Sequence, residues 1–230
     1  MKTIGLLGGM SWESTQSYYQ IINRGINQRL GGLHSAKIML YSVDFAQIEV
    51  LQHQGNWQGT ADILIEAAKA IEAGGADFLL ICTNTMHKVA EQIESHIAIP
   101  LLHIADATGE QLKQDKITRV GLLGTRFTMT EAFYKTRLTD KFGIEVVVPD
   151  DVDQTLIHEV IYQELCLGII NENSRSAYLS IIEKLYQQGA QAVILGCTEI
   201  ALLVQQDQTT VPLYDTVTIH AASAVDAALS

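Results

Sequence analysis

The sequence of 230 residues predicts an α/β protein built from two similar units, and two observations support this prediction. Short apolar runs alternate with longer amphipathic stretches, which is typical of parallel sheets whose strands are joined by helices. The same landmarks also occur twice in the same order, which indicates an internal duplication. Each unit is therefore expected to be Rossmann-like or flavodoxin-like, with the functional site in the cleft between the two domains.

The duplication is visible in three landmarks that keep a nearly constant spacing. The Gly-Leu-Leu-Gly run at residues 5–8 recurs at 121–124, and the Pro-Leu pair at residues 100–101 recurs at 212–213. Thr83, which follows an apolar run, corresponds to Cys197, which follows another. The two copies therefore differ at one reactive position, where a hydroxyl in the first half stands opposite a thiol in the second.

The predicted elements follow in order along the chain. Apolar runs of up to six residues predict strands at 3–7, 37–42, 78–82 and 101–104 in the first unit, and at 120–123, 145–148, 192–195 and 213–215 in the second series. Apolar residues at helical spacing predict helices at 14–28, 60–73, 86–94, 130–141, 155–167 and 175–187. Ser14 and Thr130 are the expected N-caps of two helices, and Gly74, Gly75 and Gly189 are expected to end others.

The boundary between the units is expected near residues 106–117, after the first Pro-Leu strand. Only a short segment follows the second Pro-Leu strand, so the last helix is expected to pack back on the first unit. The prediction is a discontinuous first domain of residues 1–105 plus 213–230 and a second domain of residues 106–212.

Composition excludes several classes of partner. The net charge is −11 and the sequence pI is about 5.0, without a cluster of Lys or Arg longer than a pair, so neither nucleic acid nor an anionic membrane is an expected partner. No stretch approaches the ~18 apolar residues of a membrane span. Residues 1–9 are expected to form a strand rather than a leader, and three cysteines are an odd number for a disulfide framework. The expected location is the reducing cytoplasm.

Segments rich in hydroxyl and amide groups follow the predicted strands at their carboxyl ends, where ligands collect in open α/β sheets. They are Met10, Ser11 and Ser14 after the first strand, Thr83, Asn84 and Thr85 after the third, Thr125, Arg126 and Thr128 after the first strand of the second unit, and Cys197, Thr198 and Glu199 after its third. Two such rims are expected to enclose a small polar ligand. Hydroxyl and backbone donors can bind a carboxylate there without a large positive field.

Ordinary structural roles compete with chemical ones at several of these positions. A cysteine at a buried strand end or within a helix is usually a small apolar residue, and this interpretation is preferred for Cys82 and Cys166. Cys197 differs because Gly196 precedes it and polar residues follow it. Thr83 alone indicates a helix-capping hydroxyl, and Glu199 could be a first-turn acid or an acceptor beside the thiol. His87 is interpreted as a surface or core histidine outside the site.

Metal and cofactor chemistry is not indicated by any motif. The glycines at positions 5, 8 and 9 lack the spacing of a dinucleotide fingerprint. No Cys/His spacing matches a zinc site, and no lysine lies in a recognisable pyridoxal phosphate context. Cofactor-free chemistry without a metal is therefore expected.

Taken together, four segments resemble the cofactor-independent aspartate/glutamate racemase family, on its aspartate racemase branch, over essentially the whole chain. They are Gly8 to Met10, Thr83 to Thr85 with His87, His158 to Gly168, and Gly196 to Glu199. The family pattern is Cys-Asn-Thr in the first half and Gly-Cys-Thr-Glu in the second, with the two thiols on opposite sides of the substrate's α-carbon. The second motif is intact here, whereas Thr83 replaces the cysteine of the first.

The resemblance implies a racemase that acts on L-aspartate or L-glutamate and forms a homodimer. Cys197 would take the α-proton of the L-enantiomer as a thiolate near neutral pH, and Thr83 would be a far weaker base on the other face. The implied substrate-binding residues are Met10, Gln52, Asn84, Thr85, Thr125, Thr198 and Glu199, with Gln52 reaching in from a predicted loop at 44–54. A position that carries a basic residue in several aspartate racemases is Cys166 here, which weakens the assignment of the substrate.

Two other functions remain open at this point. Relatives with a single cysteine decarboxylate malonates or isomerise maleate, because one thiol suffices to protonate an enediolate or to add to an alkene. The other alternative to a racemase is a protein that only binds amino acids, because a racemase that evolved into a sensor would be expected to lose a catalytic thiol.

Overall fold

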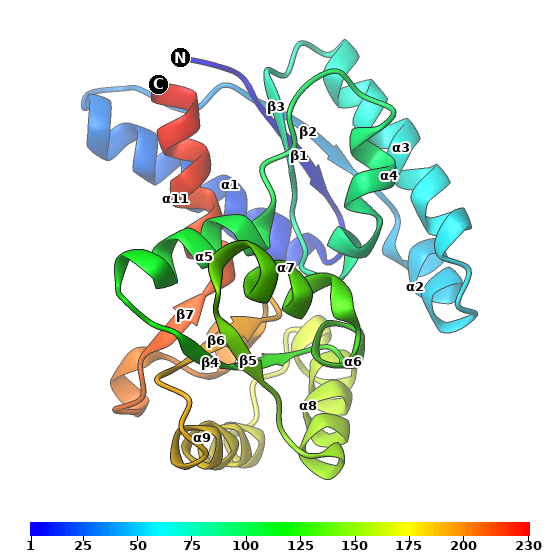
Figure 1. Ribbon diagram of the computed structural model, residues 1–230. Coiled ribbons are helices and arrows are strands. Elements are labelled where there is room, and N and C mark those ends of the chain that lie inside the picture. The colour runs from blue at the N-terminus through cyan, green and yellow to red at the C-terminus, as the bar shows by residue number, and fades with distance from the viewer. The chain divides into compact units, whose positions relative to one another are not determined.

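The computed structural model describes all residues from 1 to 230, and the predicted α/β fold with parallel sheets is confirmed (Figure 1). The chain divides into two compact units. The first contains Met1–Ile104 and His220–Ser230, and the second contains Ala105–Ile219. Each unit has one sheet, and every strand pair in both sheets is parallel.

In the first unit, strands β1 (Ile4–Gly8), β2 (Ile38–Ser42) and β3 (Phe78–Ile81) form a sheet in the order β2-β1-β3. Helices α1 (Trp12–Leu30) and α11 (Thr216–Leu229) lie on one face, and α3 (Trp57–Ala73) and α4 (Ala90–Glu94) lie on the other (Figure 1). Helix α2 (Phe45–His53) packs against α3, and a 3₁₀ helix, η1 (Thr85–Val89), precedes α4. Leu7, Leu64, Leu79 and Ile81 lie in the buried core between the sheet and α3. The apolar stripe of α3 thus closes one face of the sheet.

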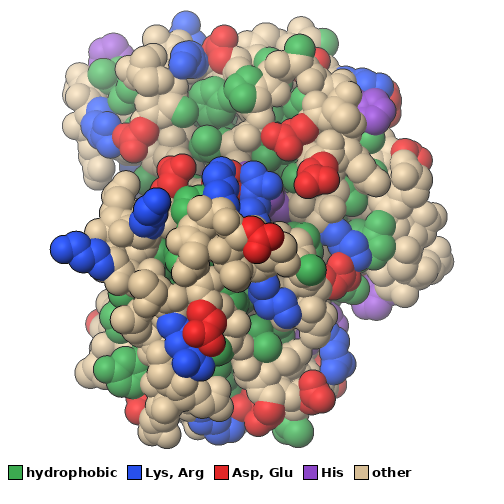
Figure 2. Space-filling model, in the orientation of Figure 1, with side chains coloured by type: hydrophobic (Ala, Val, Ile, Leu, Met, Phe, Trp, Pro, Cys, Tyr) green, Lys and Arg blue, Asp and Glu red, His purple; other side chains and the backbone are tan.

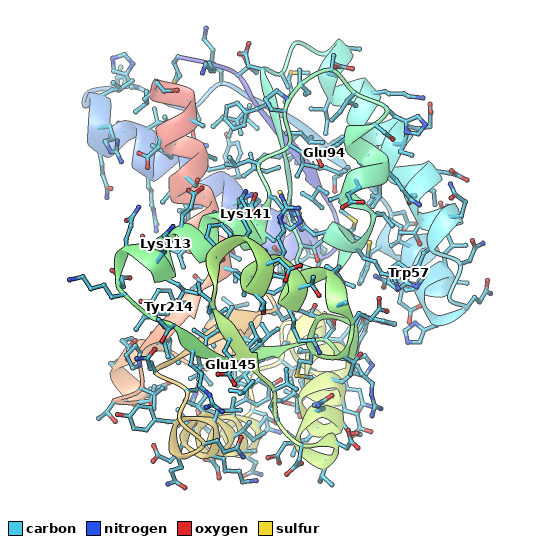
Figure 3. The ribbon with its side chains drawn as sticks, viewed as in Figure 1. Trp57, Glu94, Lys113, Lys141, Glu145 and Tyr214 are labelled. Carbon is cyan, nitrogen blue, oxygen red and sulfur yellow. The ribbon has the colours of Figure 1, made fainter.

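In the second unit, strands β4 (Arg119–Gly124), β5 (Glu145–Val147), β6 (Ala192–Gly196) and β7 (Leu213–Asp215) form a sheet in the order β5-β4-β6-β7. Helices α5 (Ile104–Gln114) and α7 (Ala132–Phe142) cover one face, and α8 (Asp151–Gln163) and α9 (Glu172–Gln187) cover the other (Figure 1). Short helices complete the unit: α6 (Arg126–Thr130), η2 (Leu165–Leu167), α10 (Ile200–Leu203) and η3 (Gln206–Gln208). Figure 3 labels Tyr214 on β7, where its hydroxyl donates to Asp115 at 2.8 Å.

Several predicted elements differ from the observed ones. The strand expected at 101–104 is reduced to a single bridge between Leu101 and Leu79, because the chain turns into α5 at Ile104. Helices α2 and α5 were not predicted, and the loop expected at 44–54 is α2. The predicted caps Ser14 and Thr130 are wrong. Ser11 is the N-cap of α1, which begins earlier than the apolar pattern indicates. The helix expected at 130–141 is α7, which begins at Ala132 with Glu131 at the N-cap position, because Thr130 still belongs to the separate short helix α6.

The surface carries charges of both signs. On the face shown in Figure 2, Lys and Arg side chains are interspersed with Asp and Glu, so the negative net charge does not form one continuous acidic patch there. None of the helices combines the length and the apolar character needed to cross a membrane.

Gly109 in the middle of α5 permits close packing against α7. A Cβ atom built at this position would lie 2.4 Å from the ring of Phe142. We expect Gly109→Ala to lower the free energy of unfolding by roughly 1–3 kcal/mol, because overpacking outweighs the gain of about 1 kcal/mol in helix propensity. Urea unfolding measures the change. Glu110→Ala, at the exposed neighbouring position, is the control and should stay within about 0.5 kcal/mol of the wild type. A stabilised Gly109→Ala protein would contradict this packing.

Candidate functional site

The first group of predicted site residues lies at the carboxyl end of the first sheet. Leu7 of β1 is in register with Ile81 of β3, so the turns that follow these strands are neighbours. Ser11 caps α1 by accepting from the backbone N–H of Ser14 at 3.3 Å. The hydroxyl of Ser14 in turn donates to the carbonyl of Cys82 at 3.0 Å. This bond ties the turn that carries Met10 to the turn that carries Thr83.

The side chains of this first group are almost completely buried. Met10, Thr83, Asn84 and Thr85 each have 8% or less of their surface exposed. The structure therefore gathers four of the predicted residues of the first unit on adjacent turns. Thr85 begins η1, and Met10 immediately precedes the N-cap of α1.

Gln52 joins this group from α2, where only 2% of its surface is exposed. Its amide nitrogen donates to the sulfur of Met86 at 3.7 Å, which places the side chain against η1. Its buried amide oxygen has no hydrogen-bond partner. An unpaired buried acceptor destabilises the folded state by about 1–3 kcal/mol, so a donor on a ligand would offset that cost. Gln52 is thus a candidate acceptor for an ammonium or amide group.

The second group lies at the carboxyl end of the second sheet. Gly124 of β4 is in register with Gly196 of β6, so Thr125 and Cys197 follow adjacent strand ends. A Cβ atom at Gly196 would lie 2.7 Å from the carbonyl oxygen of Leu123, and this close approach requires glycine before the cysteine. Thr125 caps α6 by accepting from the backbone N–H of Thr128 at 3.3 Å. The structure therefore brings Thr125 to the same edge as Cys197.

Cys197 is paired with a carboxylate. Its Sγ–H donates to Oε2 of Glu199 at 3.0 Å, and the hydroxyl of Thr198 donates to the same oxygen at 2.6 Å. All three residues are at least 92% buried. The three predicted residues of this turn thus form one hydrogen-bonded cluster, in which a single carboxylate oxygen collects two donors.

This arrangement changes the expected ionisation of Cys197. Burial, and then the negative charge of Glu199, raise the pKa of the Cys197 thiol well above its usual value. The raised pKa runs against the expectation that Cys197 is a thiolate near neutral pH. The groups that perturb the thiol are Glu199 and Cys166, neither of which is cationic, and α10 beyond the turn has only four residues. Both effects favour the thiol form, whose proton is directed at the Glu199 carboxylate.

The other two cysteines lie in different surroundings. Cys82 is completely buried, and burial raises the pKa of its thiol. Cys166, in η2, is partly buried and close enough to Cys197 to contribute to the raised pKa of that thiol. All three cysteines are free thiols. Nowhere in the chain do three or more His, Cys, Asp or Glu side chains converge so that they could hold a metal ion.

His87, which the sequence analysis placed outside the site, touches it directly. It is 3% exposed, and its Nδ1 lies 2.8 Å from the carbonyl oxygen of Thr83. The sequence does contain a signal for this contact, because His87 lies four residues after Thr83. In a helical turn, a side chain at that spacing can reach the carbonyl one turn earlier.

The comparisons with known proteins agree with one another. The profile of the Asp/Glu/Hydantoin racemase family matches residues 7–224. A broad specificity amino-acid racemase from Bacillus subtilis (strain 168) is 26% identical over 238 residues, covering 99% of this chain and 98% of that protein. A solved structure of a candidate Asp/Glu racemase from Yersinia pestis has a TM-score of 0.93 and 56% identity, with 100% of both chains covered. An aspartate racemase homologue from Pyrococcus horikoshii OT3 has a TM-score of 0.86 and 33% identity over 100% of both chains.

Proposed function

Because the chain belongs to the Asp/Glu/Hydantoin racemase family, we propose that it is an amino-acid racemase that takes the α-proton of L-aspartate or L-glutamate through Cys197. The solved relatives described as Asp/Glu and aspartate racemases support the choice of acidic amino acids. The proposed reaction uses neither a metal nor pyridoxal phosphate. A thiol, a carboxylate and hydroxyl donors are sufficient for proton transfer.

The observation that carries the proposal is the hydrogen bond from Cys197 to Glu199. A thiol that must act as a base has to lose its own proton first, and its raised pKa makes direct loss to water unfavourable. The carboxylate at 3.0 Å is positioned to receive this proton. The resulting thiolate is desolvated, which makes it a stronger base toward a bound substrate.

The proton balance of the proposed reaction is as follows. Glu199 accepts the Sγ proton of Cys197, and the Cys197 thiolate then removes the α-proton of the L-enantiomer and is again a thiol. The carbanion receives a proton on its opposite face from Thr83 or from a water molecule that the Thr83 hydroxyl holds. Glu199 then releases its proton to solvent, and Thr83 or its water molecule regains a proton from solvent, which restores the starting state. Backbone and hydroxyl donors such as Thr85, Thr125 and Thr198 would stabilise the substrate carboxylate while negative charge develops beside it.

The two faces of this reaction differ in strength. The Cys197 thiol that forms when the α-proton is removed can return a proton to the carbanion, whereas a hydroxyl is a poor base and a slow donor at neutral pH. Exchange of the α-proton in L-substrate should therefore be faster than formation of D-product. The equilibrium constant between enantiomers is one, so kcat/KM must be equal in the two directions for any variant. The asymmetry consequently appears in isotope exchange and in kcat, not in kcat/KM.

The proposal is tested by incubating the protein with L-aspartate in deuterated water that contains a chelator and no added pyridoxal phosphate. We expect deuterium at the α-carbon of recovered L-aspartate and a slower appearance of D-aspartate. Release of carbon dioxide from a malonate without α-proton exchange would instead show a decarboxylase. Binding of L-aspartate without exchange would show a receptor, and either result would refute the proposed racemase.

Thr83→Cys is expected to strengthen the weak face. A second thiol in place of the hydroxyl should raise α-proton exchange in D-aspartate by at least about tenfold, within the range of 10² to 10⁴ that a positioned acid–base group contributes. The kcat for D-aspartate should rise more than that for L-aspartate. Circular dichroism of each enantiomer and the deuterium content of recovered substrate measure these changes. Equal exchange from both enantiomers in the wild type would show that Thr83, or another group, is already an adequate base.

A further inference from the structure

Three buried histidines cluster in the first unit, beside the turn that carries Thr83. They are His87 in η1, His103 after the Leu101 bridge, and His220 in α11, with exposed fractions of 3%, 5% and 0%. The ring centroids of His87 and His103 are 4.4 Å apart, and those of His87 and His220 are 6.0 Å apart. None of the three has a role in the proposed proton transfers.

The hydrogen bonds of His87 define its tautomer. The carbonyl of Thr83 can only accept, so Nδ1–H of His87 donates to it at 2.8 Å. Nε2 then carries the lone pair, and it accepts from the backbone N–H of Ile104 at 3.2 Å. A neutral imidazole thus bridges two peptide groups, one at Thr83 and one at Ile104.

The segment that supplies Ile104 is itself fixed from other sides. Leu102 donates its backbone N–H to the carbonyl of Leu79 in β3 at 2.8 Å. The carbonyl of Leu102 accepts from Nε2–H of His220 at 2.7 Å, and Nδ1 of His220 accepts from the hydroxyl of Tyr18 at 2.8 Å. His87 therefore rests on a segment that β3, α11 and α1 hold in place. A support of this kind restricts the positions that the Thr83 peptide can adopt.

We propose that His87 is the positioning residue for the Thr83 face of the reaction, because it ties the Thr83 carbonyl to the buried Ile104 peptide. This inference rests on the proposed function and assigns His87 no contact with substrate. Loss of the bond to Thr83 should displace the hydroxyl on which D-product formation depends. Cys197, which belongs to the other unit, should be unaffected.

Two substitutions separate the two hydrogen bonds of His87. The amide nitrogen of asparagine can take the place of Nδ1 and keep the donor to Thr83. The amide of glutamine reaches the position of Nε2 and keeps the acceptor for Ile104, but it loses that donor. We expect His87→Gln to slow D-aspartate formation from the L-enantiomer by about 10- to 100-fold. His87→Asn should lose clearly less, and α-proton exchange in L-aspartate should stay within about twofold of the wild type in both variants.

His96→Gln is the matched control. Nδ1 of His96 lies 2.8 Å from the carbonyl of Gln92, which is the same spacing of four residues along the chain, but this pair is exposed. Its substitution should leave both rates unchanged. A double substitution tests the route of the effect: in a Thr83→Ala background, His87→Gln should cause no further loss of D-aspartate formation, because the group that it positions is absent.

The outcomes distinguish the proposed racemase activity from the positioning role of His87. No exchange of L-aspartate by the wild type would refute the proposed function and this role of His87 with it. Exchange by the wild type, combined with equal losses in His87→Gln and His87→Asn, would overturn the role of His87 alone. The same conclusion follows if L-exchange falls in parallel with D-product, or if neither rate changes. Thermal melting of each variant shows whether a parallel loss comes from unfolding.

Discussion

Replacement of Cys197 by serine is expected to abolish racemisation and to stop α-proton exchange in L-aspartate, with a loss of at least about 100-fold in both. Serine preserves the shape of the side chain but keeps its proton at neutral pH, even with the Glu199 carboxylate beside it. The substitution therefore removes the base without removing the packing. Circular dichroism follows racemisation, and mass spectrometry of recovered substrate follows exchange.

Two matched controls accompany this substitution. Cys166→Ser changes the thiol that helps to raise the pKa of Cys197. Cys82→Ser changes the buried thiol next to Thr83 in the sequence. Both variants should keep substantial activity wherever they fold, which thermal melting establishes. A Cys197→Ser protein with near wild-type turnover, together with an inactive but folded Cys82→Ser protein, would place the catalytic thiol in the other unit.

Acidification is expected to destabilise the protein through His220. Burial lowers the pKa of this histidine from 6.5 to about 4, so between these values the unfolded chain binds a proton that the folded chain does not. The contribution of His220 to the free energy of unfolding is therefore fully present above pH 6.5, and it is lost as the pH drops toward 4. A shift of this size corresponds to a loss of roughly 3 kcal/mol across the window. Urea unfolding at several values of pH between 7 and 4 measures it.

His220→Gln isolates this contribution. Glutamine can still donate to the carbonyl of Leu102, but it does not titrate, so the variant should be less stable than the wild type at pH 7 and should show a shallower dependence on pH. The carboxylates titrate in both proteins, so the difference between the two slopes of unfolding free energy against pH removes their contribution. Identical slopes in the two proteins would mean that His220 is not the group responsible.

The alternation of apolar runs and helical stripes was sufficient to predict the sheets, because buried parallel strands and amphipathic helices leave strong local patterns. It missed α5, in which Gly109 interrupts an otherwise periodic run for the sake of contact with Phe142. It also missed α2, although Asp44 supplies a cap for that helix by accepting from Ala46. The extended segment at Leu101 looked like a strand because local pattern does not reveal whether a neighbour is available for pairing.

The turns that carry the candidate site could be predicted from the sequence. Strand order places Met10 beside Thr83 and Thr125 beside Cys197, and both pairings follow from the duplication. The ionisation of Cys197 was not predictable, because it depends on burial and on the direction of the Glu199 carboxylate. His87 was missed for a similar reason: its sequence neighbours do not show that Ile104, far along the chain, completes its hydrogen bonds.

The single bridge at Leu101 makes the two halves of the duplication unequal in local stability. In the second unit the corresponding Pro-Leu segment is a true strand, β7, with three residues in register with β6. In the first unit the same edge is closed by two backbone hydrogen bonds, from Leu79 to Pro100 and from Leu102 to Leu79. Few bonds must break for this edge to fray, so it belongs among the segments that open without global unfolding. Because Ile104 lies at its end, such an opening would release the support of Thr83 while leaving the turn of Cys197 intact.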